Sequence, residues 1–288
     1  MDGSQIDFLY RIAALRNEWL DLIFRFLNYF DTGYFPMVVI PIVWIGISYR
    51  WGLKFALLFT LNALLNYHLK YLFDLPRPVV EYPDLAMLST SSPGFPSGAA
   101  QTAMLVGGFL IYGWKSKWAW VIAIPYILLI SFSRLYLGVH YPMDILGGWI
   151  FGLALLLVFI FCIKPLERFL HKQGPGFSLF LCILFSVLYI LFLPHALGVR
   201  FIGAFLGFGV GAYLSIYLSL YPTHHRSFQT RVLSALFAVL STFAVYSLIP
   251  QQMPPAIFML VGALWISLCA SPFSKMIVQF VLPDKRRT

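Results

Sequence analysis

The chain is poor in charged residues and in cysteine. Only 11% of its 288 residues are Asp, Glu, Lys or Arg, and 60% are hydrophobic. An average soluble domain carries about 25% charged residues, so a soluble protein of this composition could not cover its surface with polar groups. Three cysteines are too few for a disulfide scaffold. They also show no metal-ligand spacing and are interpreted as small hydrophobic residues.

Acidic residues are scarcer still, since 11 Asp and Glu face 20 Lys and Arg, a net charge of +9. Such a balance often indicates a nucleic-acid partner. Here the basic residues stand in ones and twos between long apolar runs, so we expect no nucleic-acid partner. The composition predicts an all-α, polytopic helical membrane protein. The first residues lack a basic n-region followed by an apolar h-region, and we expect no cleavable signal peptide.

Long apolar runs are what the chain has in abundance. A membrane-spanning helix needs about 20 mostly apolar residues, and we predict nine spans, or eight if the short first one does not cross. They are 33–49, 52–73, 96–114, 118–136, 141–163, 177–194, 199–221, 230–249 and 254–280. Residues 5–30 mix apolar and charged positions, which predicts an amphipathic surface helix. We therefore expect an N-terminal surface helix (1–32), a helical core with the motifs (33–170) and additional C-terminal transmembrane helices (171–288) of unknown role.

Basic residues concentrate in alternate loops. One side receives 13 basic residues against Glu167 and Asp284, a net charge of +11, and the other side has a net charge of −2. Because the cytoplasmic side of a membrane protein is the more positive one, the C-terminus is expected in the cytoplasm. The N-terminus and the loop 74–95 are expected outside, facing the exterior, the periplasm or a lumen.

Several cations and a helix start fall on this outer side. Lys70 and Arg77 occur as Lys-x6-Arg-Pro, and Arg134 follows Ser133 near the end of a later segment. Three positive charges suit a phosphate, with Arg giving bidentate contacts. Ser97 and Gly98 stand at a predicted helix N-terminus, where free backbone N–H groups favour an anion.

A histidine and an aspartate complete the pattern. His140 and Asp144 are four residues apart and share one helix face. An Asp bonded to one ring nitrogen orients the other nitrogen and stabilises the charge that develops on the ring. This arrangement predicts a nucleophilic histidine beside a phosphate site.

Together these residues closely resemble the three signature motifs of the type-2 phosphatidate phosphatase superfamily. The matching patterns are Lys-x6-Arg-Pro, Pro-Ser-Gly and Ser-Arg-x5-His-x3-Asp. The resemblance implies a metal-independent phosphoric monoester or diphosphate hydrolase that needs no cofactor. It also implies that His140 is phosphorylated and Asp144 orients it. The phosphoryl-binding residues would be Lys70, Arg77, Ser97, Gly98 and Arg134.

The chain departs from the family pattern at Ala99, where the family has the histidine that acts as general acid. Loss of a positioned acid typically costs about 10²–10⁴ in rate, so we predict an inactive or impaired form. Two origins stay open: an engineered His→Ala replacement, which the intact remaining motifs favour, or a natural alanine in a weak enzyme or binding protein. The other histidines are poorly placed to substitute; they are His68, His171, His195, His224 and His225.

The expected substrate is a lipid phosphate that reaches the site from the surrounding membrane lipids. Candidates are phosphatidate-like lipids, phosphatidylglycerol phosphate, polyprenyl diphosphate, lipid A and sphingoid-base phosphates. Alternative functions are a non-catalytic lipid-phosphate binding protein, a lipid or solute transporter, and a sugar-phosphate phosphatase. The acidic residues of the outer loop, Asp74, Glu81 and Asp84, are interpreted as solvated charges, and no metal is expected. The sequence leaves the oligomeric state open.

Overall fold

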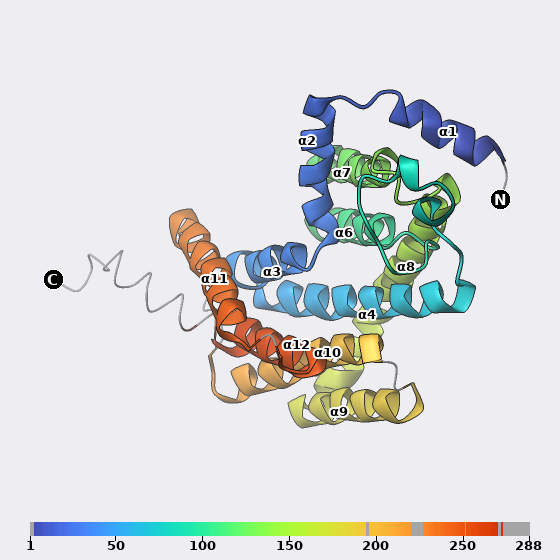
Figure 1. Ribbon diagram of the computed structural model, residues 1–288. Coiled ribbons are helices and arrows are strands. Elements are labelled where there is room, and N and C mark those ends of the chain that lie inside the picture. The colour runs from blue at the N-terminus through green and yellow to red at the C-terminus, as the bar shows by residue number, and fades with distance from the viewer. Residues whose placement is uncertain (1–2, 194–195, 221–226, 251, 270–271, 273–288) are drawn as a thin grey trace. The chain divides into compact units, whose positions relative to one another are not determined.

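The computed structural model describes residues 3–193, 196–220, 227–250, 252–269 and 272, and in these ranges every regular element is a helix (Figure 1). The predicted all-α fold class is confirmed. The chain divides into two compact units, 1–35 with 62–164 and 36–61 with 165–288. The boundaries at 33 and 171 proposed from the sequence stay a prediction.

The first unit contains the motifs. Its elements are α1 (Gly3–Ala13), α2 (Glu18–Leu27), η1 (Asn28–Asp31), the end of α4 (Tyr49–Phe73), α5 (Pro78–Glu81), η3 (Pro83–Leu85), α6 (Gly98–Trp114), α7 (Lys117–Tyr136) and the start of α8 (Pro142–Gln173). Figure 1 shows α2 lying across α6 and α7. α2 contacts α7, and η1 contacts both α6 and α7. The N-terminal segment is therefore part of the packed unit.

The second unit holds the remaining helices. They are α3 (Tyr34–Pro41), the π-helical η2 (Ile42–Ile47), α9 (Pro175–Phe192), α10 (Ala196–Tyr217), α11 (Phe228–Leu248), α12 (Pro255–Leu264) and the π-helical η4 (Trp265–Cys269), with the start of α4 and the end of α8. Helices α10 and α12 approach closely because α10 presents glycines four residues apart. A Cβ at Gly207 would lie 2.6 Å from the carbonyl oxygen of Leu260. Small residues at such a contact are typical of helix packing in membranes.

Five described helices are long and apolar enough to cross a membrane: Lys117–Tyr136, Pro142–Gln173, Pro175–Phe192, Gly198–Tyr217 and Phe228–Leu248. The bent pair formed by Glu18–Asp31 and Tyr34–Ile47 would add a sixth. The chain is thus a multi-pass membrane protein, whereas nine spans remain a prediction. Among the predicted segments that do not qualify, α6 has only 17 residues, and 254–280 lies partly outside the described residues.

The N-terminal segment contains two helices separated by a turn, where the sequence pattern predicted one surface helix. Asn17 caps α2 by accepting a hydrogen bond from the backbone N–H of Leu20 at 3.0 Å. In the turn, Arg16 donates to the carbonyl oxygens of Leu85 and Tyr136, both at 2.7 Å. These bonds to the body of the unit fix a break that the amphipathic pattern does not encode.

The start of α8 packs tightly on the start of α6. A Cβ at Gly148 would lie 2.6 Å from the carbonyl oxygen of Ser97, and one at Gly152 would lie 2.5 Å from that of Gln101. The backbone N–H of Ser97 also donates to the carbonyl oxygen of Asp144 at 2.9 Å. Glycine at these positions therefore brings the second and third motifs together.

Gly138 shapes the turn that leads to His140, and we expect Gly138→Ala to destabilise the protein. Its φ is +69°, a conformation that costs a non-glycine residue about 1–2 kcal/mol, and an added Cβ would collide with the Leu85 carbonyl. The thermal unfolding midpoint in detergent should fall by about 2–6 °C. Gly176→Ala is the control, because a Cβ there meets nothing within 4 Å. Equal midpoints for the two variants would contradict the assignment.

Candidate active site

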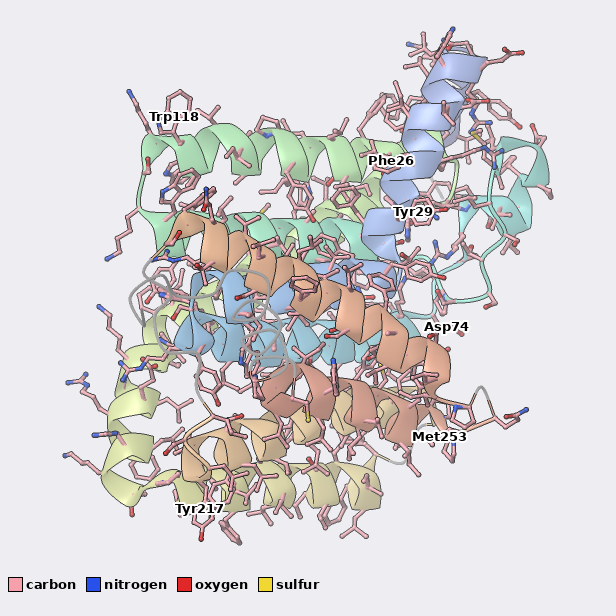
Figure 2. The ribbon with its side chains drawn as sticks, turned by 90° about the vertical axis from the view of Figure 1, so that its left-hand side faces the viewer. Phe26, Tyr29, Asp74, Trp118, Tyr217 and Met253 are labelled. Atoms are coloured by element: carbon pink, nitrogen blue, oxygen red, sulfur yellow. The ribbon has the colours of Figure 1, made fainter. Side chains whose placement is uncertain are left out.

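The motif residues gather at one end of the first unit. Lys70 lies in the last turn of α4 and Arg134 in the last turn of α7, while Asp144 lies in the first turn of α8. Figure 2 shows Asp74 and Tyr29 on the same side of the unit, and Trp118 at the opposite end of α7. The structure thus brings together residues that are up to 74 positions apart in the sequence, Lys70 and Asp144.

His140 and Asp144 form a buried pair, each 2% exposed. The His140 Nδ1 atom lies 3.0 Å from Asp144 Oδ2, and the same oxygen accepts from the backbone N–H of Tyr141 at 2.9 Å. Burial lowers the pKa of His140 well below 6.5, and the charges of Arg77, Lys70 and Arg134 act in the same direction. The ring is therefore neutral at neutral pH, as a nucleophilic imidazole must be.

Arg77 fixes the tautomer of that ring. Its Nη1 lies 3.0 Å from His140 Nε2, and because a guanidinium can only donate, Nε2 must accept. The ring proton then stands on Nδ1 and points to Asp144. Arg77 itself is held by the carbonyl oxygen of Ser92 at 2.7 Å, the hydroxyl of Ser92 at 3.0 Å and the carbonyl oxygen of Val139 at 3.0 Å. The lone pair on Nε2 thus faces a fixed cation.

Lys70 contributes a second buried cation. Its Nζ donates to the carbonyl oxygens of Pro93 at 2.6 Å and of Gly94 at 3.2 Å, in the loop that leads into α6. The side chain is 8% exposed, so its charge is little screened by water. Burial and the neighbouring charge of Arg77 lower the pKa of Lys70 to about 7, and a bound anion would favour its charged form.

Arg134 is the third cation, and residues of η1 bind it. Its Nη1 donates to Asn28 Oδ1 at 2.9 Å and to Asp31 Oδ2 at 3.0 Å. The Nη2 atom is buried and has no hydrogen-bond partner within the described part of the chain. A buried guanidinium nitrogen left without an acceptor is costly, and a bound phosphoryl oxygen would satisfy it.

Ser97 and Gly98 take the positions expected at the start of α6. Ser97 is the N-cap residue, and its Oγ accepts from the backbone N–H of Ala100 at 3.5 Å. Any side chain at 98 would collide with α4, because a Cβ there would lie 2.9 Å from Asn66 Oδ1. Close packing against α4 thus explains the glycine at 98, in addition to the expected approach of an anion to the backbone.

Ala99 points into an apolar cluster and is 1% exposed. Phe24 and Leu27 of α2 belong to that cluster, together with Leu137 and Val139 of the turn before His140. A histidine at 99 would have to displace some of these side chains, since a well-packed core does not accept extra volume freely. The packing of α2 therefore matches an alanine at this position.

A buried amide network escaped the sequence reasoning. Asn66 Nδ2 donates to Gln101 Oε1 at 2.9 Å and to the carbonyl oxygen of Pro96 at 3.3 Å, and Gln101 Nε2 donates to Asn62 Oδ1 at 3.0 Å. The network ties α4 to the first turn of α6, so it holds the Pro-Ser-Gly motif beside Lys70. A signal existed in the sequence, because Asn62, Asn66 and Lys70 recur every four residues on one face of α4.

The contribution of η1 was also missed, since Asn28 and Asp31 were assigned to a surface helix. Among the remaining histidines, His68 packs edge-on against the ring of Tyr67, with centroids 5.4 Å apart. His171 belongs to the second unit, and His195, His224 and His225 lie outside the described residues.

The family model of the PAP2 superfamily matches residues 51–168. Phosphatidylglycerophosphatase B of Bacillus subtilis is 30% identical over 174 residues, which are 56% of this chain and 83% of that protein. These findings confirm the resemblance seen in the motifs. The chain is a helical membrane protein of the PAP2 superfamily.

Two further proteins are similar to this chain. A dihydrosphingosine 1-phosphate phosphatase of Schizosaccharomyces pombe is 32% identical over 166 residues, 52% of this chain and 40% of that protein. The crystal structure of a PAP2-type phosphatidylglycerolphosphate phosphatase from Bacillus subtilis is 27% identical, with a TM-score of 0.49 over 58% of this chain and 88% of that one.

Proposed function

We propose that this protein is a membrane lipid phosphate phosphatase that uses His140 as its nucleophile. The observation that supports it most is the buried alignment of Arg77, His140 and Asp144 with a lone pair on His140 Nε2. The names of its relatives, which are phosphatases of a glycerophospholipid and of a sphingoid-base phosphate, agree with this substrate class. A lipid head group would reach the cations while its tails remain among the membrane lipids.

In the proposed reaction, His140 Nε2 attacks phosphorus in line with the leaving oxygen. Lys70, Arg77 and Arg134 stabilise the charge on the three equatorial oxygens, and Asp144 stabilises the phosphorylated ring through Nδ1. Substrate oxygens replace His140 as the partner of Arg77 Nη1, which frees the ring lone pair for attack. Water then releases inorganic phosphate from the ring.

The site is proposed to open on the extracytoplasmic face, with the C-terminus in the cytoplasm. The distribution of Lys and Arg among the loops supports this orientation. Lys54 is one of the 13 basic residues on the side expected in the cytoplasm, and it forms an ion pair at 2.8 Å with Glu167 of the same side, within the second unit. The contact between these two residues agrees with their assignment to the same side of the membrane.

Ala99 makes leaving-group protonation the weak point of the reaction, so the protein should favour diphosphates over monophosphates. The leaving group of a prenyl diphosphate is itself a phosphate ester and departs with little protonation, whereas a lipid alkoxide needs a proton. We expect Ala99→His to raise phosphate release from a lipid monophosphate by on the order of 10²-fold and from a prenyl diphosphate by less than about tenfold.

The test measures phosphate release by the purified, detergent-solubilised protein and by Ala99→His on both lipids. Unfolding midpoints of the two proteins show whether the histidine is accommodated beside Phe24 and Leu27. An equal rise on both substrates would exclude the leaving-group explanation. Release from neither substrate by either protein would exclude the phosphatase and favour a lipid-phosphate binding protein or a transporter.

A further inference from the structure

The N-terminal segment places a carboxyl group directly at the phosphate site. Asp31 Oδ2 accepts from Arg134 Nη1 at 3.0 Å, and the unpartnered Nη2 belongs to the same guanidinium. A phosphoryl oxygen bound by Nη2 would therefore lie next to the Asp31 carboxyl. Asp31 also interacts electrostatically with Lys70 and Arg77, although its direct contact is with Arg134.

Asp31 differs from the other carboxyl group of the site in its exposure. Its side chain is 37% exposed, whereas that of its partner Arg134 is 2% exposed. Asp144 is 2% exposed, and its Oδ2 already binds the His140 ring and the Tyr141 backbone. Asp31 is thus the more exposed of the two carboxyl groups, and its exposed surface leaves it accessible to a departing alcohol.

The same segment also fills the region around position 99. Phe24 and Leu27 of α2 pack in the apolar cluster that contains Ala99, and η1 follows α2 directly. This segment precedes residues 51–168, the part matched by the family model. The segment formed by α2 and η1 therefore packs against Ala99 and also places the Asp31 carboxyl beside Arg134.

We propose that Asp31 is a further catalytic residue, which donates a proton to the leaving oxygen of a lipid monophosphate in this chain. The inference rests on the phosphatase function proposed above. In this role Asp31 would supply the proton that the resemblance assigns to a histidine at position 99.

The proposed reaction has two steps, and each conserves protons and electrons. In the first step, the His140 Nε2 lone pair forms a bond to phosphorus, the bond from phosphorus to the lipid oxygen breaks, and that oxygen takes the Asp31 proton and leaves as an alcohol. In the second step, the Asp31 carboxylate takes a proton from the attacking water, the N–P bond breaks and phosphate departs. The proton on Asp31 comes from the bound lipid phosphate monoanion, so that the two steps need no other acid.

The charged and titratable groups that face Asp31 constrain this role. They are Arg134 and Tyr126 of α7, Lys70 of α4, and Arg77 of the loop before α5. Asp31 therefore interacts with the same three cations that would bind the phosphoryl group.

The test compares Asp31→Asn with the native protein on two monophosphates that differ in leaving group. Asn keeps the shape and the acceptor for Arg134 but supplies no acidic proton. We expect hydrolysis of phosphatidate to fall by about 10²-fold, and that of p-nitrophenyl phosphate, whose leaving group needs no proton, to change by less than about threefold. Asp31→Glu, which keeps the acid, should retain more phosphatidate hydrolysis than Asp31→Asn.

Asn28→Ala is the matched control, because it removes a bond to the same Arg134 Nη1 without removing an acid. It should slow both substrates in parallel. Parallel slowing by Asp31→Asn, or unchanged phosphatidate hydrolysis that still requires His140, would overturn the role of Asp31 alone. Failure of the native protein to release phosphate from either ester would overturn the proposed function and this role with it.

Discussion

Replacement of His140 by Asn should abolish phosphate release. Asn keeps an amide N–H near the position of Nδ1, so the bond to Asp144 can persist while the nucleophilic Nε2 is lost. Removal of a nucleophile typically lowers kcat by on the order of 10⁴–10⁶-fold. We expect a loss of this size on lipid monophosphate and diphosphate alike, measured as inorganic phosphate released by purified protein.

A covalent-labelling experiment makes this prediction specific. A substrate with a labelled phosphoryl group should leave acid-labile label on the native chain and none on His140→Asn. Tyr10→Phe is the control, since Tyr10 is exposed and its hydroxyl bonds only the loop residue Asp84 among the contacts described. Undiminished turnover by His140→Asn would exclude His140 as the nucleophile and with it the proposed mechanism.

Replacement of Arg77 by Lys should be the next most damaging change, even though the charge is kept. The planar guanidinium of Arg77 donates hydrogen bonds to Ser92, to Val139 and to the His140 ring, and a lysine ammonium cannot reproduce this geometry. Loss of one positioned donor to a developing negative charge typically costs about 10²–10³ in kcat. We expect a fall of that order in kcat on a prenyl diphosphate, which needs no acid for its leaving group.

Arg11→Lys is the matched control, because Arg11 is an exposed residue of α1 in the same unit. It should retain full activity and the native unfolding midpoint. If Arg77→Lys kept more than about a third of the native kcat, the guanidinium geometry of Arg77 would not be needed for transition-state stabilisation.

Much of the helical framework follows from composition alone. The predicted segments 52–73 and 118–136 correspond to α4 and α7 within a few residues, because a run of about 20 apolar residues has few alternatives to a buried helix. Local rules also work at the helix starts. Ser97 caps α6 as predicted, since an N-cap depends on residues only three positions apart.

Contacts between residues far apart in the sequence could not be predicted from local patterns. Arg134 and Asp31 are 103 positions apart, and nothing local indicates that they pair. The break between α1 and α2 likewise depends on Arg16 reaching Leu85 and Tyr136. Such contacts are decided by the packing of whole helices, which single-helix periodicity does not record.

The sequence by itself determined that this is a polytopic helical protein with phosphatase motifs and an alanine where the family has a histidine. The motif spacings sufficed because His140 and Asp144 are only four residues apart, although His140 lies in the turn before α8 and not on the helix face expected from the sequence. Only the tertiary structure decided what surrounds that alanine. The packing of α2 against α7, and of η1 against α6 and α7, buries Ala99 and brings the Asp31 carboxyl to Arg134.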